Sequence, residues 1–128
     1  MAINEGERTI LTDHMRRAAR VALRAHGDAE PNPMVGCVVL DRAGEIVAEA
    51  RTARCGGAHA ERAALGIAGV LARGGTLLTT LEPCCHLGRT PPCTDAIIEA
   101  GIERVVYGTV DPNPTAAGGE GVLVEAGV

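Results

Sequence analysis

Two short segments gather a set of reactive side chains that most constrains this largely aliphatic chain. His59-Ala60-Glu61 supplies an imidazole and a carboxylate, and the stretch from Pro83 to Cys93 supplies three thiols. One imidazole and two thiolates make a three-ligand zinc site with an open fourth position, which is typical of catalytic rather than structural zinc. Zinc lowers the pKa of water in that position, and a carboxylate two residues after the histidine could move the proton. The fold must therefore bring these two segments together.

The second thiolate ligand has two candidates. Zinc deaminases carry His-x-Glu followed by Pro-Cys-x-x-Cys, with the Glu as acid and base, but residue 87, where the last Cys would stand, is a leucine. Either the adjacent Cys85 or the more distant Cys93 must replace it. Adjacent cysteines seldom reach one ion without strain, and Cys93 follows two prolines at the start of an expected helix. We therefore favour zinc on His59, Cys84 and Cys93, in a site suited to hydrolytic deamination of a ring.

Composition narrows the classes of partner. The 128 residues suffice for one domain with a real core. Tyr107 is the one aromatic residue, and the net charge is −4, so base stacking and nonspecific binding to nucleic acid are both disfavoured. No stretch approaches the roughly 18 consecutive apolar residues of a membrane helix, and the first ten residues have no secretory apolar segment. We expect no nucleic acid or membrane partner. The odd number of cysteines, five, favours a reduced cytoplasmic protein.

Periodicity and turn residues predict the order of elements. We expect helices at 12–26, 59–72 and 92–100, and strands at 34–40, 45–50, 76–81 and 105–110. Thr12 or Asp13 would cap the first helix, whose arginines would face solvent, and Cys37 would pack as a small apolar residue in the first strand. The first two strands form a hairpin and the last two a parallel crossover unit. The prediction is one domain over residues 1–128, a three-layer α/β/α fold with a mixed sheet of about five strands. The last seven residues fit a strand and a helix stub equally well.

Several polar residues near the motifs have more than one interpretation. Glu82 could be a second catalytic carboxylate, could orient a substrate, or could solubilise a strand end. His86 is an alternative metal ligand, ranked after His59. Asn32, held between two prolines, could bind a ligand or its own backbone. Cys55 precedes His59 by four residues and is expected to be uninvolved.

The chain resembles the deaminase domain of the bifunctional riboflavin-biosynthesis deaminase/reductases, which have the cytidine-deaminase-like fold. The resemblance covers roughly residues 12–125, and it is carried by Asn32-Pro33-x-Val35-Gly36, His59-Ala60-Glu61, Thr80-Leu81-Glu82-Pro83-Cys84, Gly88-Arg89-Thr90-Pro91-Pro92-Cys93 and Asp111-Pro112-Asn113-Pro114. It implies zinc on His59, Cys84 and Cys93, with Glu61 as the catalytic proton shuttle. The implied substrate is a small aminopyrimidine with a ribosyl phosphate, diaminohydroxyphosphoribosylaminopyrimidine. The resemblance also implies a homo-oligomer, a dimer or tetramer. The implied substrate-binding positions are Asn32, Thr52, His86, Arg89, Thr90, Asp111 and Asn113.

Three departures from the family pattern keep other functions open. Thr52 stands where many members carry a His, the Gly118–Gly121 segment lacks the usual Arg or Lys, and residues 1–128 contain no reductase domain. One alternative is a stand-alone deaminase of another base, nucleoside or antibiotic-pathway intermediate. Another is a structural zinc module that binds a partner. That module would need a fourth ligand, such as Cys85 or His86, and would leave Glu61 without a role.

Overall fold

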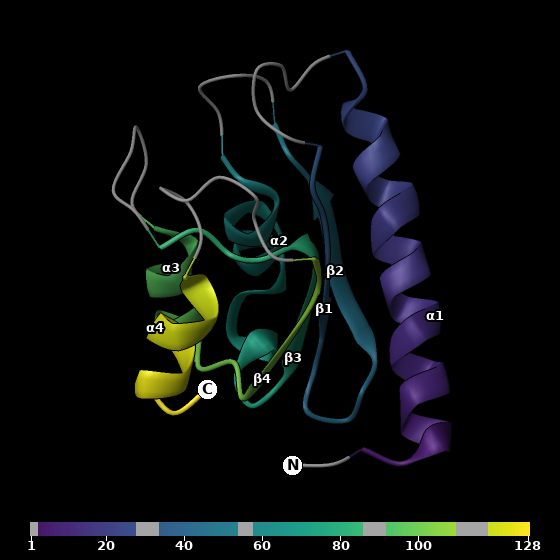
Figure 1. The fold of residues 1–128 in the computed structure, drawn as a ribbon. Coiled ribbons are helices and arrows are strands. Elements are labelled where there is room, and N and C mark those ends of the chain that lie inside the picture. Colours follow the sequence, from purple (N-terminus) through teal and green to yellow (C-terminus); the bar gives the residue numbers. More distant parts are fainter. Residues whose placement is uncertain (1–2, 28–33, 54–57, 86–91, 110–117) are drawn as a thin grey trace.

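The computed structural model describes residues 3–27, 34–53, 58–85, 92–109 and 118–128. Helix α1 covers one face of a central sheet, and α2, α3 and α4 gather on the other face (Figure 1). The predicted three-layer α/β/α arrangement is confirmed. In chain order, the elements are α1 (Glu5–Ala22), the 3-10 turn η1 (Leu23–Ala25), β1 (Gly36–Leu40), β2 (Ile46–Arg51), α2 (Ala60–Ala68), the 3-10 turn η2 (Gly69–Ala72), β3 (Thr76–Leu81), α3 (Cys93–Glu99), β4 (Arg104–Thr109) and α4 (Gly119–Glu125).

The sheet is mixed, as predicted, and its described part has four strands in the order β2-β1-β3-β4. β1 pairs antiparallel with β2 and with β3, whereas β3 and β4 are parallel across the α3 crossover. Because β1 and β3 run in opposite directions, the end of β3 lies beside the start of β1. The Gly36 N–H donates to the Thr80 hydroxyl at 3.1 Å across this junction. The segment that leaves β3 toward the cysteines therefore starts from a fixed position.

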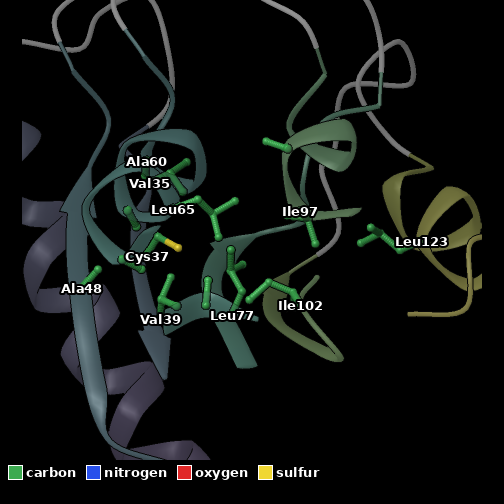
Figure 2. Close-up of a cluster of buried hydrophobic side chains, with 14 residues drawn as sticks. Val35, Cys37, Val39, Ala48, Ala60, Leu65, Leu77, Ile97, Ile102 and Leu123 are labelled. Carbon is green, nitrogen blue, oxygen red and sulfur yellow. The ribbon is translucent and has the colours of Figure 1, made fainter. Parts of the chain in front are cut away.

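Aliphatic side chains fill both spaces between the layers. Leu11 and Ala18 of α1 pack on Val38, Leu40 and Leu78 on one face. On the other face, the larger cluster joins α2, α3 and α4 to the strands, and Figure 2 shows the Cys37 sulfur inside it. Cys37 is 0% exposed, so the prediction that it packs as an apolar residue is confirmed. The cluster's labelled members are Val35, Cys37, Val39, Ala48, Ala60, Leu65, Leu77, Ile97, Ile102 and Leu123.

The first helix begins earlier than predicted, at Glu5 rather than at residue 12. Asn4 is its N-cap, and the Asn4 side chain accepts a hydrogen bond from the Glu7 N–H at 2.8 Å. The predicted cap Thr12 instead lies inside the helix, where its hydroxyl donates to the Arg8 carbonyl. The prediction failed because the polar first turn hides the apolar periodicity, while residues 4 and 7 have the spacing of a capping box.

The arginines of α1 lie on its exposed side, as predicted, and β2 pairs with Arg17 of α1 and with Arg24 of η1. Arg17 and Arg24 contact the Glu49 carboxylate at 2.6 and 3.4 Å. The hydrogen bond from Arg17 is the main cause that lowers the pKa of Glu49. These contacts fasten the outer side of α1 to the edge strand β2.

The C-terminal residues form a helix, α4, which the sequence alone left undecided. Gly118 precedes it with φ of 106°, a left-handed conformation that favours glycine. Leu123 is buried in the larger core cluster. Among the described residues, none of the helices combines the length and apolar character needed to cross a bilayer.

Candidate metal centre

Three potential ligand atoms meet where α2, α3 and the end of β3 converge. His59 is the N-cap residue of α2, Cys84 follows β3, and Cys93 is the first residue of α3. The His59 Nδ1 atom lies 3.5 Å from the Cys84 sulfur and 3.3 Å from the Cys93 sulfur. The three atoms all lie within 4.8 Å of one another. Tetrahedral zinc with about 2.3 Å bonds to sulfur and about 2.0 Å to nitrogen separates its ligand atoms by about 3.5 Å, so this donor set fits the ion.

The pKa values of the two cysteines are shifted in opposite directions. A hydrogen bond from the Cys93 side chain, together with His59 and the Cys93 N–H at 3.3 Å, lowers the pKa of Cys84 to about 4. The same hydrogen bond and burial raise the pKa of Cys93. The pKa of His59 is raised, chiefly by its hydrogen bond with Cys84. Two adjacent thiolates repel each other, and a divalent cation between them would offset that repulsion, which is the chemistry of a zinc ligand set.

Glu61 lies beside these groups in the first turn of α2. It is only 4% exposed, and burial is the main cause that raises its pKa to about 7. The charge of Cys84 raises the pKa of Glu61 further, whereas a hydrogen bond with Cys93 lowers it. Burial, and after it the charge of Glu61, raise the pKa of Cys37 in the core. A carboxyl whose pKa is close to neutrality can both accept and return a proton at physiological pH.

The environment of Glu82 excludes one of its three interpretations, and the two functional roles stay predictions. It is 5% exposed, so it does not solubilise the strand end. Its carboxylate accepts the Glu120 N–H at 3.1 Å, and its own N–H donates to the Thr109 carbonyl at 2.8 Å. Glu82 therefore ties the segment before Cys84 to β4 and to the start of α4.

Thr52 uses its hydroxyl within the fold. The oxygen accepts the Val35 N–H at 2.9 Å and donates to the Val35 carbonyl at 3.4 Å, and the residue is 4% exposed. These bonds fix the backbone just before β1. A contact between Thr52 and a substrate stays a prediction.

The remaining sequence candidates divide into two groups. Cys85 is half-buried, but it is not part of the described ligand cluster, so the adjacent-cysteine alternative loses its geometric support. The predicted substrate contacts Asn32, His86, Arg89, Thr90, Asp111 and Asn113, and also Cys55, lie outside the described residues.

Sequence reasoning missed one cation close to the centre. Arg62 follows Glu61 in α2, and its guanidinium donates to the Pro92 carbonyl at 3.3 Å. The only hint in the sequence is a basic residue in the first turn of a helix, where the helix dipole disfavours positive charge.

Residues 8–109 match the family model described as the cytidine and deoxycytidylate deaminase zinc-binding region. The chain belongs to this deaminase family. Zinc is thus the metal expected at the centre, and His59, Cys84 and Cys93 are the described residues that can hold it.

Relatives of this chain include riboflavin-biosynthesis proteins, which supports the resemblance to the riboflavin branch. The chain is 48% identical to riboflavin biosynthesis protein RibD of Corynebacterium ammoniagenes over 93% of its length, and 52% identical to RibD of Escherichia coli over 82%. It covers 35% and 28% of those proteins, about a third of their length. A diaminohydroxyphosphoribosylaminopyrimidine deaminase/5-amino-6-(5-phosphoribosylamino)uracil reductase of Thermotoga maritima has a similar fold. Its TM-score is 0.88 at 46% identity, over 94% of this chain and 35% of that one. RibD of Acinetobacter baumannii gives a TM-score of 0.91 at 41% identity, over 95% and 34%.

Proposed function

We propose that this chain is a zinc-dependent hydrolytic deaminase that converts diaminohydroxyphosphoribosylaminopyrimidine in riboflavin biosynthesis. The observation that carries the reaction class is a buried carboxyl, Glu61, beside a cluster of one imidazole and two thiols. The substrate is supported by the name of the T. maritima relative, whose deaminase acts on this compound.

The mechanism assigns one task to each group. His59, Cys84 and Cys93 would hold the ion, which when bound supplies a Lewis acid that makes water reactive at neutral pH. Glu61 accepts a proton from the attacking water and donates it to the ring nitrogen, and it then moves the remaining hydroxyl proton to the departing amino group as the carbonyl forms. One water is consumed, one ammonia leaves, and a ring carbonyl replaces the amine. The burial of Glu61 limits exchange of these protons with bulk water.

The substitution Glu61→Gln tests the role of the carboxyl. It preserves shape and hydrogen-bonding capacity, so zinc content and thermal stability should remain close to those of the parent. Ammonia release should fall by about 100-fold to 10,000-fold, the usual contribution of general acid–base catalysis. Glu103→Gln is the matched control, because Glu103 is exposed next to the start of β4, at the opposite end of the sheet. Full activity of Glu61→Gln would contradict the mechanism.

The substrate is tested by ammonia release from the zinc-loaded chain. The diaminopyrimidine ribosyl phosphate is compared with its dephosphorylated form, with cytidine and with guanine. Turnover confined to the phosphate would support the riboflavin step, with Thr52 and Glu120 as tolerated variations. Turnover on another amine would assign the same chemistry to a different pathway.

We further propose that residues 1–128 act as one deaminase domain, in a dimer or tetramer, in the cytoplasm. An exposed apolar stripe on α2 and η2 supports the proposed oligomer. It consists of Ile67, Val70 and Leu71, and Val70 is 88% exposed. No disulfide joins the four described cysteines, which suits a reducing compartment. Light scattering coupled to gel filtration would give the mass of the particle, and a monomer at micromolar concentration would overturn the assembly.

A further inference from the structure

Arg62 occupies a position that the local physics of helix α2 does not explain. It lies in the first turn, two residues before the point where Ala64 enters the core, and it is half-buried. The N-terminal end of a helix carries partial positive charge, so a cation there is unfavourable. Arginine is also seldom buried unless it is paired. A tertiary contact must therefore account for its placement.

That contact is made with the peptide group between Pro92 and Cys93. The Arg62 Nη2 atom donates to the Pro92 carbonyl oxygen at 3.3 Å. The N–H of the same peptide group, which belongs to Cys93, donates to the Cys84 sulfur at 3.3 Å. One peptide group is thus held at its oxygen by α2 and at its nitrogen by the cysteine that follows β3.

These two contacts determine how the backbone is oriented at Cys93. A peptide group is planar, so fixing the directions of its C=O and N–H fixes its orientation as a whole. The proline ring restricts φ of Pro92, here −56°, and removes further freedom. The Pro92 carbonyl also accepts the Asp95 N–H at 3.2 Å, which begins the first turn of α3. Arg62 therefore acts at the junction where the chain enters α3.

We propose that Arg62 is a positioning residue of the metal centre: by holding the Pro92 carbonyl, it orients the Pro92–Cys93 peptide and so places the Cys93 sulfur opposite His59 and Cys84. The inference rests on the metal centre of the proposed function, but it is independent of the substrate. In this role Arg62 acts through the Pro92–Cys93 peptide group rather than as a ligand.

The test measures metal binding rather than turnover. Arg62→Met keeps most of the side-chain volume and removes both the donor and the charge, whereas Arg62→Lys keeps the charge and one donor group. Zinc affinity is measured by competition with a chromogenic chelator, and Co²⁺ is used as a probe because thiolate ligands give it intense charge-transfer bands. Arg20→Met is the matched control, since Arg20 is exposed on α1, away from the cysteines.

We expect Arg62→Met to bind zinc about 10-fold to 100-fold more weakly, the usual effect of losing a group that orients a metal ligand. Its Co²⁺ bands should lose intensity because one thiolate is misplaced, and Arg62→Lys should recover part of both properties. Zinc affinity within twofold of the parent, with unchanged Co²⁺ bands, would overturn the proposal. If Arg62→Met does not fold by circular dichroism, the same criterion applies to Arg62→Leu, which also removes the donor and the charge.

The outcomes separate this inference from the proposed reaction. A parent chain that binds zinc, loses it on Arg62 substitution and yet releases no ammonia would overturn the reaction alone. A parent chain that binds no zinc would overturn both.

Discussion

Replacing Gly119 by alanine tests whether α4 is seated on the metal-binding segment. A Cβ atom built on Gly119 lies 1.9 Å from the Pro83 carbonyl oxygen and 3.0 Å from the Pro83 carbonyl carbon. Both neighbours are backbone atoms, so no side chain can rotate away. Pro83 directly precedes Cys84, which makes this contact a direct link between the C-terminal helix and a proposed zinc ligand.

The magnitude follows from the overlap. Real Cβ atoms essentially never come closer than 3.0 Å to such a neighbour, so the helix or the Pro83 peptide must move by about 1 Å. Forcing an extra methyl group into a packed region typically costs about 1–3 kcal/mol. In a domain of this size each kcal/mol lowers the melting temperature by about 4 °C. Gly119→Ala should therefore melt some degrees below the parent and should also bind zinc less tightly, since the displacement reaches Cys84.

Gly121 provides the control within the same helix. A Cβ atom on Gly121 meets no other atom within 4 Å, so alanine there should stabilise the protein by up to about 1 kcal/mol through helix propensity. Urea unfolding and chelator competition on the two variants separate the close contact from the general effect of losing a glycine. If Gly119→Ala unfolds at the same urea concentration as Gly121→Ala and binds zinc equally well, the seating of α4 on Pro83 is wrong.

Two further predictions concern charge and ligand identity. The lowered pKa of Glu49 means that its pairing with Arg17 stabilises the fold above the ordinary Glu pKa and that this stabilisation is lost as the pH falls through the lowered value. Because the pair is partly exposed, with 48% of the Arg17 and 24% of the Glu49 side chain accessible, Glu49→Gln should cost about 0.5 kcal/mol at pH 7 and less at pH 3 by urea unfolding, and an equal cost at both pH values would contradict this. Cys84→Ser should lower zinc affinity by more than about 100-fold, beyond the loss expected for groups that only orient ligands, whereas Cys85→Ser should change it only slightly. Equal losses in a chelator competition would restore Cys85 as a ligand.

Local sequence signals predicted the strands well, and they also predicted that the three candidate ligands lie close together. Strand β3 was expected at 76–81 and is found at Thr76–Leu81, because Gly74-Gly75 turns the chain before it and Pro83 stops it afterwards. The pairing of Cys84 with Cys93 followed from chemistry, since neighbouring cysteines rarely share an ion, and the structure places those two sulfurs near His59.

Features that depend on distant contacts could not be predicted in this way. The apolar run in α4 suits a strand as well as a helix, and the burial of Leu123 together with the bond between Glu82 and the Glu120 N–H selects the helix. The role of Arg62 was equally hidden, because its partner is a backbone carbonyl 30 residues away. Neither contact leaves a periodic pattern in the sequence.

The placement of His59 and Glu61 on one short helix has a consequence for how this protein could change. The proposed proton carrier and one metal ligand are carried together by α2, which is packed into the core through Ala60, Ala64 and Leu65. None of the predicted substrate contacts belongs to α2, which spans Ala60–Ala68. A substitution at one of them does not alter the residues that pack α2 into the core. Selection could therefore exchange the amine that is recognised while inheriting the hydrolytic machinery intact.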